Sequence, residues 1–345
     1  MKKLFLFLLL PFCFSCTNPI EKTVGEPVWT PQTSKTQSHL RGLSSVSENV
    51  AWASGTKGAV IKTTDGGLTW EDVSVAQNDT IDFRDIEAFD ENTALVLSAG
   101  LPAVIYKTID GGQSWEQKYF TQKEGTFYDA MDFWDDQTGI AFGDAVDGRL
   151  LILRTFDGGD NWEELPYENR PKALDGQGGF AASGTCLRTQ GENNVYIGLG
   201  GDESTLFYSR DQGQTWSKTE TPLDHNSSAG VFSIQFRDKK TGIMVGGDYR
   251  ADSLTSKNNI AYTQNGGETW KKVMSGMEPN GYRSCIDFYK DLVLVVGRGS
   301  SDYYRAGERA YTPMDGKYYS VSTSKDGKSV WASGSRGSIA KLNFK

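Results

Sequence analysis

Three arginines that are far apart in the chain could together bind an anionic group. When the repeated units described below are aligned on the glycine that ends their second apolar run, Arg41, Arg84 and Arg283 occupy one equivalent position, and Asp129 occupies it in the third unit. Guanidinium groups bind carboxylates and phosphates through paired, charge-assisted hydrogen bonds. The alignment therefore predicts an anion-binding funnel. The alternative interpretation is that these charges only neutralise one another.

Further polar residues are expected beside the same funnel. Asp144 follows a second apolar run, and two longer segments, 247–252 and 299–305, follow the corresponding runs of later units. They add the candidates Asp248, Arg250, Tyr303 and Arg305. Because aromatic and arginine side chains are enriched at protein interfaces, a protein partner is one prediction. The other is a hydrolase or lyase for an acidic glycan, in which two of Asp129, Asp144 and Asp248 would lie about 5–10 Å apart.

A repeated eight-residue motif divides the chain into the units that would position these residues. Each copy has Ser or Thr first, Asp or Asn third, Gly fifth and Trp eighth. The copies contain Asp65 and Trp70, Asp110 and Trp115, Asp157 and Trp162, Asp211 and Trp216, and Asn265 and Trp270. Their tryptophans are 45, 47, 54 and 54 residues apart. Such a period indicates a solenoid, a propeller or an array.

The motif itself predicts a hairpin turn followed by a buried anchor. The Asp or Asn side chain accepts hydrogen bonds from nearby backbone amides, and glycine supplies a positive φ angle. The Ser or Thr hydroxyl can tie the strand end to the turn, while Trp buries a large apolar surface at the start of the next strand. No copy carries the converging oxygen ligands of a calcium site, so the motif is predicted to be structural and no metal is expected.

The spacing predicts an all-β fold, a seven-bladed β-propeller with four strands in each blade. Five units carry the motif, a sixth lacks it, and a seventh ends after three expected strands. In the fourth unit the inner strand is expected at 180–186. The segment around Trp29 is expected to supply the missing strand of the last blade, beside Trp331. An N-terminal strand would then close the ring and remove its exposed edges.

The motif resembles the Asp-box, or BNR repeat, of β-propellers. Over about residues 26–345 the count and spacing of the units resemble the photosystem II stability/assembly factor-like group, and 128–133 and 180–185 are similar to stretches common in its non-photosynthetic bacterial members. The resemblance implies a non-catalytic binding or assembly scaffold. Bacterial members often carry the label oxidoreductase or glycosyl hydrolase. The chain has no dinucleotide-binding glycine motif that leads into a helix, so no cofactor is predicted.

Sialidases share the Asp-box and provide the enzymatic alternative. That resemblance would imply three arginines that bind a substrate carboxylate, a Tyr/Glu pair and an Asp. The Arg-Ile-Pro stretch typical of their first blade is absent here. We therefore expect binding without catalysis, with a glycan-active hydrolase or lyase as the second hypothesis.

The N-terminus predicts export. Residues 1–16 combine Lys2 and Lys3 with an apolar run that is too short for a membrane span, as in a secretory signal peptide. Ser15-Cys16 resembles a bacterial lipobox, which makes Cys16 the predicted lipidation site, with ordinary cleavage as the alternative. Residues 17–25 would be a tether and 26–345 a single propeller. The predicted location is the periplasm or outer membrane of a bacterium, with membrane contact through the lipid anchor.

Composition excludes several classes of function. The net charge is −8 and no basic run is present, which argues against nucleic acid as a partner. His39 and His225 are the only histidines, so neither a His-rich metal site nor a Ser–His triad is expected. Cys186 and Cys285 fall on inner strands of blades that are not neighbours, so we expect buried free thiols in a monomeric protein.

Overall fold

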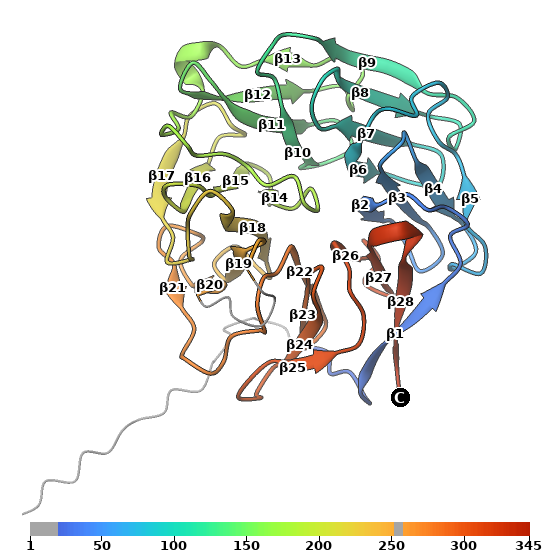
Figure 1. Ribbon diagram of the computed structural model, residues 1–345, viewed down its shortest axis with the longest axis vertical. Helices are drawn as coiled ribbons and strands as arrows, with labels where there is room; N and C mark the ends of the chain where they lie inside the picture. The colour runs from blue at the N-terminus through green and yellow to red at the C-terminus, as the bar shows by residue number, and fades with distance from the viewer. Residues whose placement is uncertain (1–19, 252–257) are drawn as a thin grey trace, which may run out of the picture.

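The computed structural model describes residues 20–251 and 258–345, and these form seven four-stranded antiparallel sheets around a central channel (Figure 1). The predicted seven-bladed β-propeller is confirmed. The predicted signal peptide and Cys16 lie outside the described residues, as does Asp252 in the 247–252 segment. No helix among the described residues is long and apolar enough to cross a membrane.

The first three blades each follow chain order from the channel outwards. Blade 1 contains β2 (Leu40–Ser45), β3 (Ala51–Gly55), β4 (Val60–Thr63) and β5 (Glu71–Asp72). Blade 2 contains β6 (Phe83–Ala88), β7 (Ala94–Ser98), β8 (Ala103–Thr108) and β9 (Glu116–Thr121). Blade 3 contains β10 (Tyr128–Phe133), β11 (Gly139–Val146), β12 (Arg149–Thr155) and β13 (Glu163–Glu164), followed by the short helix η1 (Tyr167–Asn169).

The remaining blades repeat this order until the last. Blade 4 contains β14 (Leu187–Gln190), β15 (Asn194–Leu199), β16 (Thr205–Ser209) and β17 (Ser217–Glu220). Blade 5 contains β18 (Ala229–Phe236), β19 (Gly242–Asp248), β20 (Ile260–Thr263) and β21 (Lys271–Lys272). Blade 6 contains β22 (Cys285–Tyr289), β23 (Leu292–Val296), β24 (Ser301–Arg305) and β25 (Thr312–Met314). Blade 7 contains β26 (Ser320–Thr323), β27 (Val330–Ser333), the short helix η2 (Ser335–Gly337), β28 (Ile339–Phe344) and β1 (Pro27–Gln32).

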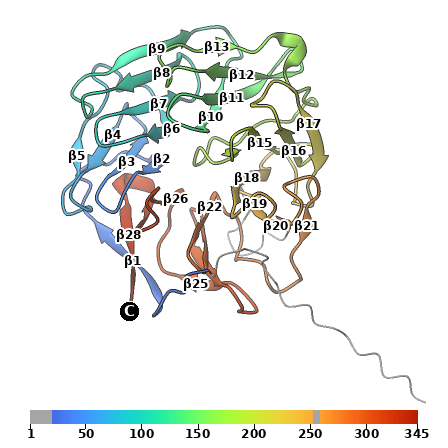
Figure 2. The ribbon, with the colours of Figure 1, turned by 180° about the vertical axis from the view of Figure 1, so that it is seen from behind.

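Blade 7 joins the two ends of the chain, as the sequence predicts. Strand β1 pairs with β28 from Pro27 opposite Phe344 to Gln32 opposite Ile339, so β1 is the outer strand of this sheet. Figure 2 shows the same closure from behind. Trp29 therefore lies in the same blade as Trp331. The ring closes without leaving β28 as an open edge, which would otherwise be free to pair with another chain.

Apolar side chains fill the spaces between neighbouring blades. Trp52 of blade 1 packs in one cluster with Phe83 and Val96 of blade 2. At the closing seam, Trp331 of blade 7 packs in one cluster with Leu40 of blade 1. The seam between the first and last blades is thus built like the others, and burial of apolar surface holds the ring together.

The repeated motif forms the predicted turn in each of the five blades that carry it. In the first copy the Thr63 hydroxyl accepts the Gly67 amide at 2.9 Å and donates to Asp65 at 2.9 Å. The Asp65 carboxylate accepts the amide and the hydroxyl of Thr69, at 2.9 and 2.6 Å. Asn265 makes the equivalent contacts in the fifth copy through its amide group. The five motif tryptophans pack as predicted anchors, with Trp70 and Trp270 buried and Trp115, Trp162 and Trp216 half-buried.

A motif carboxylate should contribute stability that depends on pH. Asp157 accepts the side-chain amide of Asn161 at 2.7 Å and its backbone amide at 2.9 Å, and these hydrogen bonds lower the pKa of Asp157 to about 2. Because the folded pKa lies below the ordinary value of 3.8, the stabilisation is present above that value and is lost as the pH falls through about 2. Asp157→Ala should lower the free energy of unfolding at pH 7 by about 1 kcal/mol.

Urea unfolding of wild type and Asp157→Ala at pH 7 and near pH 2 measures this effect. The difference between the two proteins should shrink at the lower pH. Asp79→Ala, which removes an exposed carboxylate outside the motifs, is the matched control and should match wild type. Equal midpoints for wild type and Asp157→Ala at pH 7 would contradict the assignment.

The predicted inner strand at 180–186 is wrong. Strand β14 begins only at Leu187, and the preceding residues run into the central channel instead (Figure 1). Gly184 has a φ of +75°, in the left-handed region that an extended strand does not use. We call residues 178–186 the channel plug.

The channel plug is held by blades on several sides of the channel. The Ser183 hydroxyl donates to the Ser284 carbonyl of blade 6 at 2.9 Å, and the Thr185 hydroxyl donates to Ser233 of blade 5 at 2.6 Å. The Gly179 amide donates to a carboxylate of blade 3 at 2.9 Å. The plug therefore lies across the channel and separates two mouths. We name them the motif-side mouth, where the repeated motifs lie, and the loop-side mouth, where the turns between second and third strands lie.

Candidate functional site

Three of the aligned candidates occupy β-bulges at the loop-side mouth. Arg41 is the extra residue between the pairs that β2 forms with β3, Arg84 has the same place between β6 and β7, and Asp129 has it between β10 and β11. A bulge breaks the alternation of a strand and redirects one side chain. The aligned position therefore corresponds to one structural position in three consecutive blades.

Arg41 is the candidate with the most open hydrogen-bonding capacity. Its guanidinium carbon lies 4.5 Å from the centre of the Tyr319 ring, a cation–π contact across the seam between blades 1 and 7. Among residues 20–251 and 258–345, no carboxylate forms an ion pair with it. Burial, with a smaller contribution from Arg84, lowers the pKa of Arg41. A half-buried cation without a carboxylate partner favours a bound anion at this point.

Arg84 lies beside Arg41 and is partly neutralised. Its Nε donates to the Asp82 carboxylate at 2.8 Å, and one terminal nitrogen lies 3.5 Å from the Ala181 carbonyl of the channel plug. Its side chain is 32% exposed, so the ion pair with Asp82 is screened by water and contributes little to stability. A guanidinium has five N–H donors, so Arg84 retains capacity for a further acceptor.

Arg283 does not join the other two arginines, and its predicted alignment is wrong by one residue. In blade 6 Arg283 has the place that Leu40 has in blade 1. The next residue, Ser284, therefore has the place that Arg41 has in blade 1. Arg283 is fully buried and forms an ion pair with the fully buried Asp302. Burial lowers the pKa of Arg283 to about 10. It is a structural residue in the wall of blade 6.

Asp129 and Asp144 lie together and both contact the channel plug. Asp129 is 1% exposed, and neither of its carboxylate oxygens accepts a hydrogen bond of normal geometry from the described residues. Burial, and then the charge of Asp144, raise the pKa of Asp129 well above its ordinary value. Asp144 accepts the Gly179 amide at 2.9 Å, and burial also raises its pKa. The plug therefore covers the Asp129 carboxyl group, whereas Asp144 stays half-buried.

The prediction that Tyr303 and Arg305 lie in a loop at this mouth is also wrong. Both belong to strand β24, because the turn before it closes between Val296 and Ser301. Tyr303 is buried, and Arg305 donates to the Gly25 carbonyl at 2.7 Å. Arg305 also pairs with Asp291 and binds Thr23. It fixes the residues before β1 against blade 6.

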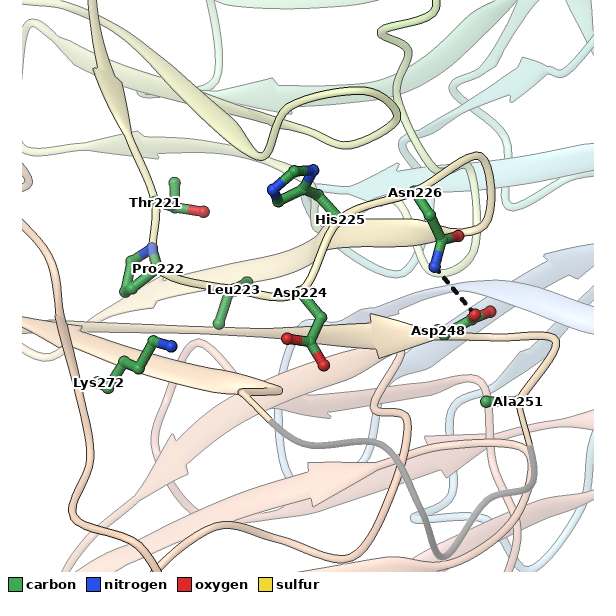
Figure 3. Close-up of a pocket in the computed structure, with 9 residues that line it drawn as sticks. All are labelled: Thr221, Pro222, Leu223, Asp224, His225, Asn226, Asp248, Ala251 and Lys272. Atoms are coloured by element: carbon green, nitrogen blue, oxygen red, sulfur yellow. Dashed lines mark hydrogen bonds between the residues drawn. The ribbon is translucent and has the colours of Figure 1, made fainter.

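Asp248 ends β19 and lines a separate surface cavity of about 530 Å³ (Figure 3). Arg250 follows it on the exposed surface. Asp248 accepts the side chains of Asn226 at 3.1 Å and Ser228 at 2.7 Å. The second histidine, His225, also lines this cavity. Among the described residues no group of three His, Cys, Asp or Glu side chains is arranged to hold a metal ion.

A polar ring at the motif-side mouth was missed by the sequence interpretation. Each inner strand of the described blades contributes one residue to this ring, and the seven residues line a cavity of about 440 Å³. In the blades whose inner strand has a bulge, the ring residue lies three positions after it. The ring consists of Ser44, Glu87, Asp132, Arg188, Gln235, Asp287 and Ser322. The spacing of the repeats carries this signal, because the ring residue lies three positions after the bulge in each of the four described blades that have one.

The charges of this ring lie close together. An Arg188 nitrogen is 3.9 Å from Asp132, and Lys325 pairs with Glu87 at 2.8 Å. Burial raises the pKa values of Asp132 and Asp287. Burial lowers the pKa of Arg188, but the charges of the Asp132 and Asp287 carboxylates outweigh this effect and raise that pKa.

The two cysteines of the propeller, Cys186 and Cys285, are buried free thiols as predicted.

Two family models match parts of the chain. Residues 22–125 match the model described as photosynthesis system II assembly factor YCF48, and residues 150–303 match the model described as sortilin, neurotensin receptor 3. No curated protein gives a significant match.

Solved structures match nearly the whole chain. YCF48 bound to a D1 peptide is 18% identical, with a TM-score of 0.66 over 94% of this chain and 98% of that one. YCF48 from Cyanidioschyzon merolae is 19% identical, with a TM-score of 0.63 over 92% and 98%. The GH74 xyloglucanase from Xanthomonas campestris is 13% identical, with a TM-score of 0.64 over 91% and 53%. Identities this low establish the fold alone, and the chain has the seven-bladed β-propeller fold that these comparisons find similar to YCF48.

Proposed function

We propose that this protein is an exported, non-catalytic binding scaffold that recognises an anionic group of a protein partner at the loop-side mouth. The observation that carries the proposal is Arg41, whose half-buried guanidinium has an aromatic neighbour but no carboxylate partner among the described residues. Arg84 lies beside it in the equivalent bulge. Two adjacent guanidiniums repel each other, and a shared carboxylate would neutralise both.

A protein is the partner that the comparisons favour. YCF48, which has the same fold, has been solved with a bound D1 peptide. In this chain Tyr319 lies near Arg41 and Phe127 lies near Arg84, while Tyr249 follows β19 on the same mouth. All three side chains are half-buried, and aromatic side chains suit a peptide surface. An acidic glycan is the competing ligand, and direct titration separates the two. A short glutamate-rich peptide should bind the mature protein more tightly than an oligogalacturonide of similar charge.

We expect the mature protein to begin at Cys16 and to carry lipid on that residue. The motivation is Ser15-Cys16, which lies shortly after the apolar run of residues 4–10. Mass spectrometry of the protein isolated from its own membranes decides this, with Cys16→Ser as the matched variant. The wild-type N-terminal peptide should carry added lipid mass, and the variant should lack it. A mature chain that begins after Cys16, or that retains an unmodified cysteine, would exclude the lipid anchor.

A further inference from the structure

The cavity at the motif-side mouth is large enough for a small ligand. Its volume of about 440 Å³ lies within the range of small-molecule sites, which begins at about 300 Å³. Ser183, Gly184 and Thr185 of the channel plug line its inner end. The plug therefore stands between this cavity and the loop-side arginines, so a ligand in the cavity would be separate from the partner of the proposed function.

Arg188 is the side chain in this cavity that lacks hydrogen-bond acceptors. Its guanidinium donates no hydrogen bond to any residue in 20–251 or 258–345, and its Nε is buried without a partner. The ion pair with Asp132, at 3.9 Å, is too long for a hydrogen bond. The side chain as a whole is 23% exposed, but burying the Nε donor without an acceptor is unfavourable. An anionic group placed beside Arg188 would satisfy these donors.

The carboxylates around Arg188 are fixed from behind and keep unused acceptor positions. Asp132 accepts the amides of Phe133 and Thr189 at 2.9 and 2.8 Å, and one oxygen of Asp287 accepts the Thr323 amide at 2.6 Å. Each carboxylate oxygen can accept about two hydrogen bonds. These groups are therefore held in place and can still accept an ammonium or hydroxyl donor from a ligand.

The cavity wall also carries an excess of negative charge. Its acidic residues are Asp85, Glu87, Asp132, Asp135, Asp136 and Asp287, and its basic residues are Arg188 and Lys325. Lys325 is already paired with Glu87. With Lys325 and Glu87 paired to each other, the remaining charges favour a cationic group at the cavity's carboxylates and an anionic group at Arg188.

We propose that the motif-side cavity binds a small zwitterion, an amino acid, with its carboxylate on Arg188 and its ammonium on Asp132 and Asp287. Each end of such a ligand meets a group of opposite charge, whereas a ligand with one charge leaves either the guanidinium or the carboxylate excess unmatched. Burial of the paired charges strengthens both contacts relative to those at an exposed surface.

Calorimetric titration of the mature protein at pH 7 tests this proposal. The probes are the proteinogenic α-amino acids, β-alanine and 4-aminobutyrate, with n-butylamine and butyrate as single-charge controls. At least one zwitterion should bind with a Kd below about 1 mM, and both single-charge probes should bind at least about tenfold more weakly. Arg188→Gln should weaken zwitterion binding at least about tenfold.

Matched variants keep the result interpretable. Arg41→Gln makes the same substitution at the other mouth and should leave zwitterion binding unchanged, which separates this site from the proposed partner site. Asp287→Asn offers a second route if Arg188→Gln fails to fold, and it should weaken binding of the zwitterion and of n-butylamine. The proposal is overturned if no zwitterion binds the wild type, or if Arg188→Gln or Asp287→Asn binds it with wild-type affinity.

Discussion

A protein that lacks residues 26–33 is expected to lose at least about 4 kcal/mol of its free energy of unfolding. The deletion removes β1 and with it six residue pairs along β28, which becomes an open edge. It also removes Trp29, whose ring packs against Tyr318 at 5.4 Å, and Gln32, which accepts the Trp70 indole N–H at 3.0 Å. The Trp29–Tyr318 contact joins β1 to the segment that precedes β26, the inner strand of blade 7. The Gln32–Trp70 hydrogen bond joins β1 to blade 1.

The measurement is urea unfolding followed by tryptophan fluorescence. Domains of ordinary stability unfold with about 5–15 kcal/mol, so a loss of this size would leave much of the truncated protein unfolded or aggregated. Deletion of residues 17–22 is the control, because among the described contacts it removes the exposed ion pair between Glu21 and Lys290 and leaves β1 intact. The control should stay within about 1 kcal/mol of wild type. A 26–33 deletion with a wild-type midpoint would show that β1 does not close the ring.

The double substitution Arg41→Ala with Arg84→Ala is expected to weaken partner binding by about a hundredfold or more. Each charge-assisted hydrogen bond in a sheltered site contributes about 1.5–3 kcal/mol, and two such contacts multiply their effects on Kd. Arg41 should account for the larger share, because Arg84 already pairs with Asp82. Stability should change little, because neither guanidinium forms a buried ion pair among the described residues.

The double variant is compared with one that loses the same charge elsewhere. Arg309→Ala with Lys271→Ala removes two exposed cations far from the loop-side mouth and should bind the glutamate-rich peptide as wild type does. The salt dependence should also fall in the Arg41/Arg84 variant, because fewer ionic contacts remain. Equal affinity in the two double variants would mean that Arg41 and Arg84 only balance carboxylates of their own protein.

The repeated motif was sufficient to predict the architecture. Its five copies fix the turn between third and fourth strands, and the unpaired third strand at Ile339–Phe344 required a partner that only the segment around Trp29 could supply. The equivalence of Arg41, Arg84 and Asp129 was predicted as well, whereas the β-bulges that these residues occupy were not. These features depend on local spacing, which sequence records directly.

The errors arose where long-range contacts decided the structure. Residues 180–186 have the composition of an inner strand, but hydrogen bonds to Ser233 and Ser284 and the left-handed Gly184 hold them in the channel. Arg283 is displaced by one residue because the hairpin of blade 6 is shorter, with Tyr289 paired to Leu292, whereas the turn of blade 1 separates Ser45 from Ala51. A shift of one residue exchanges channel-facing and core-facing positions. A short turn before β24 likewise moved Tyr303 from an expected loop into a strand.

Photo-crosslinking from position 319 tests the central claim most directly. Tyr319 lies under the Arg41 guanidinium, so a photoreactive phenylalanine analogue at this position reports on whatever occupies the loop-side mouth. In the native cell envelope we predict one major protein adduct from position 319, its loss when Arg41 and Arg84 are both alanine, and its persistence in the Arg309/Lys271 variant. An adduct of equal yield in the Arg41/Arg84 variant, or one that contains glycan without protein, would contradict the account.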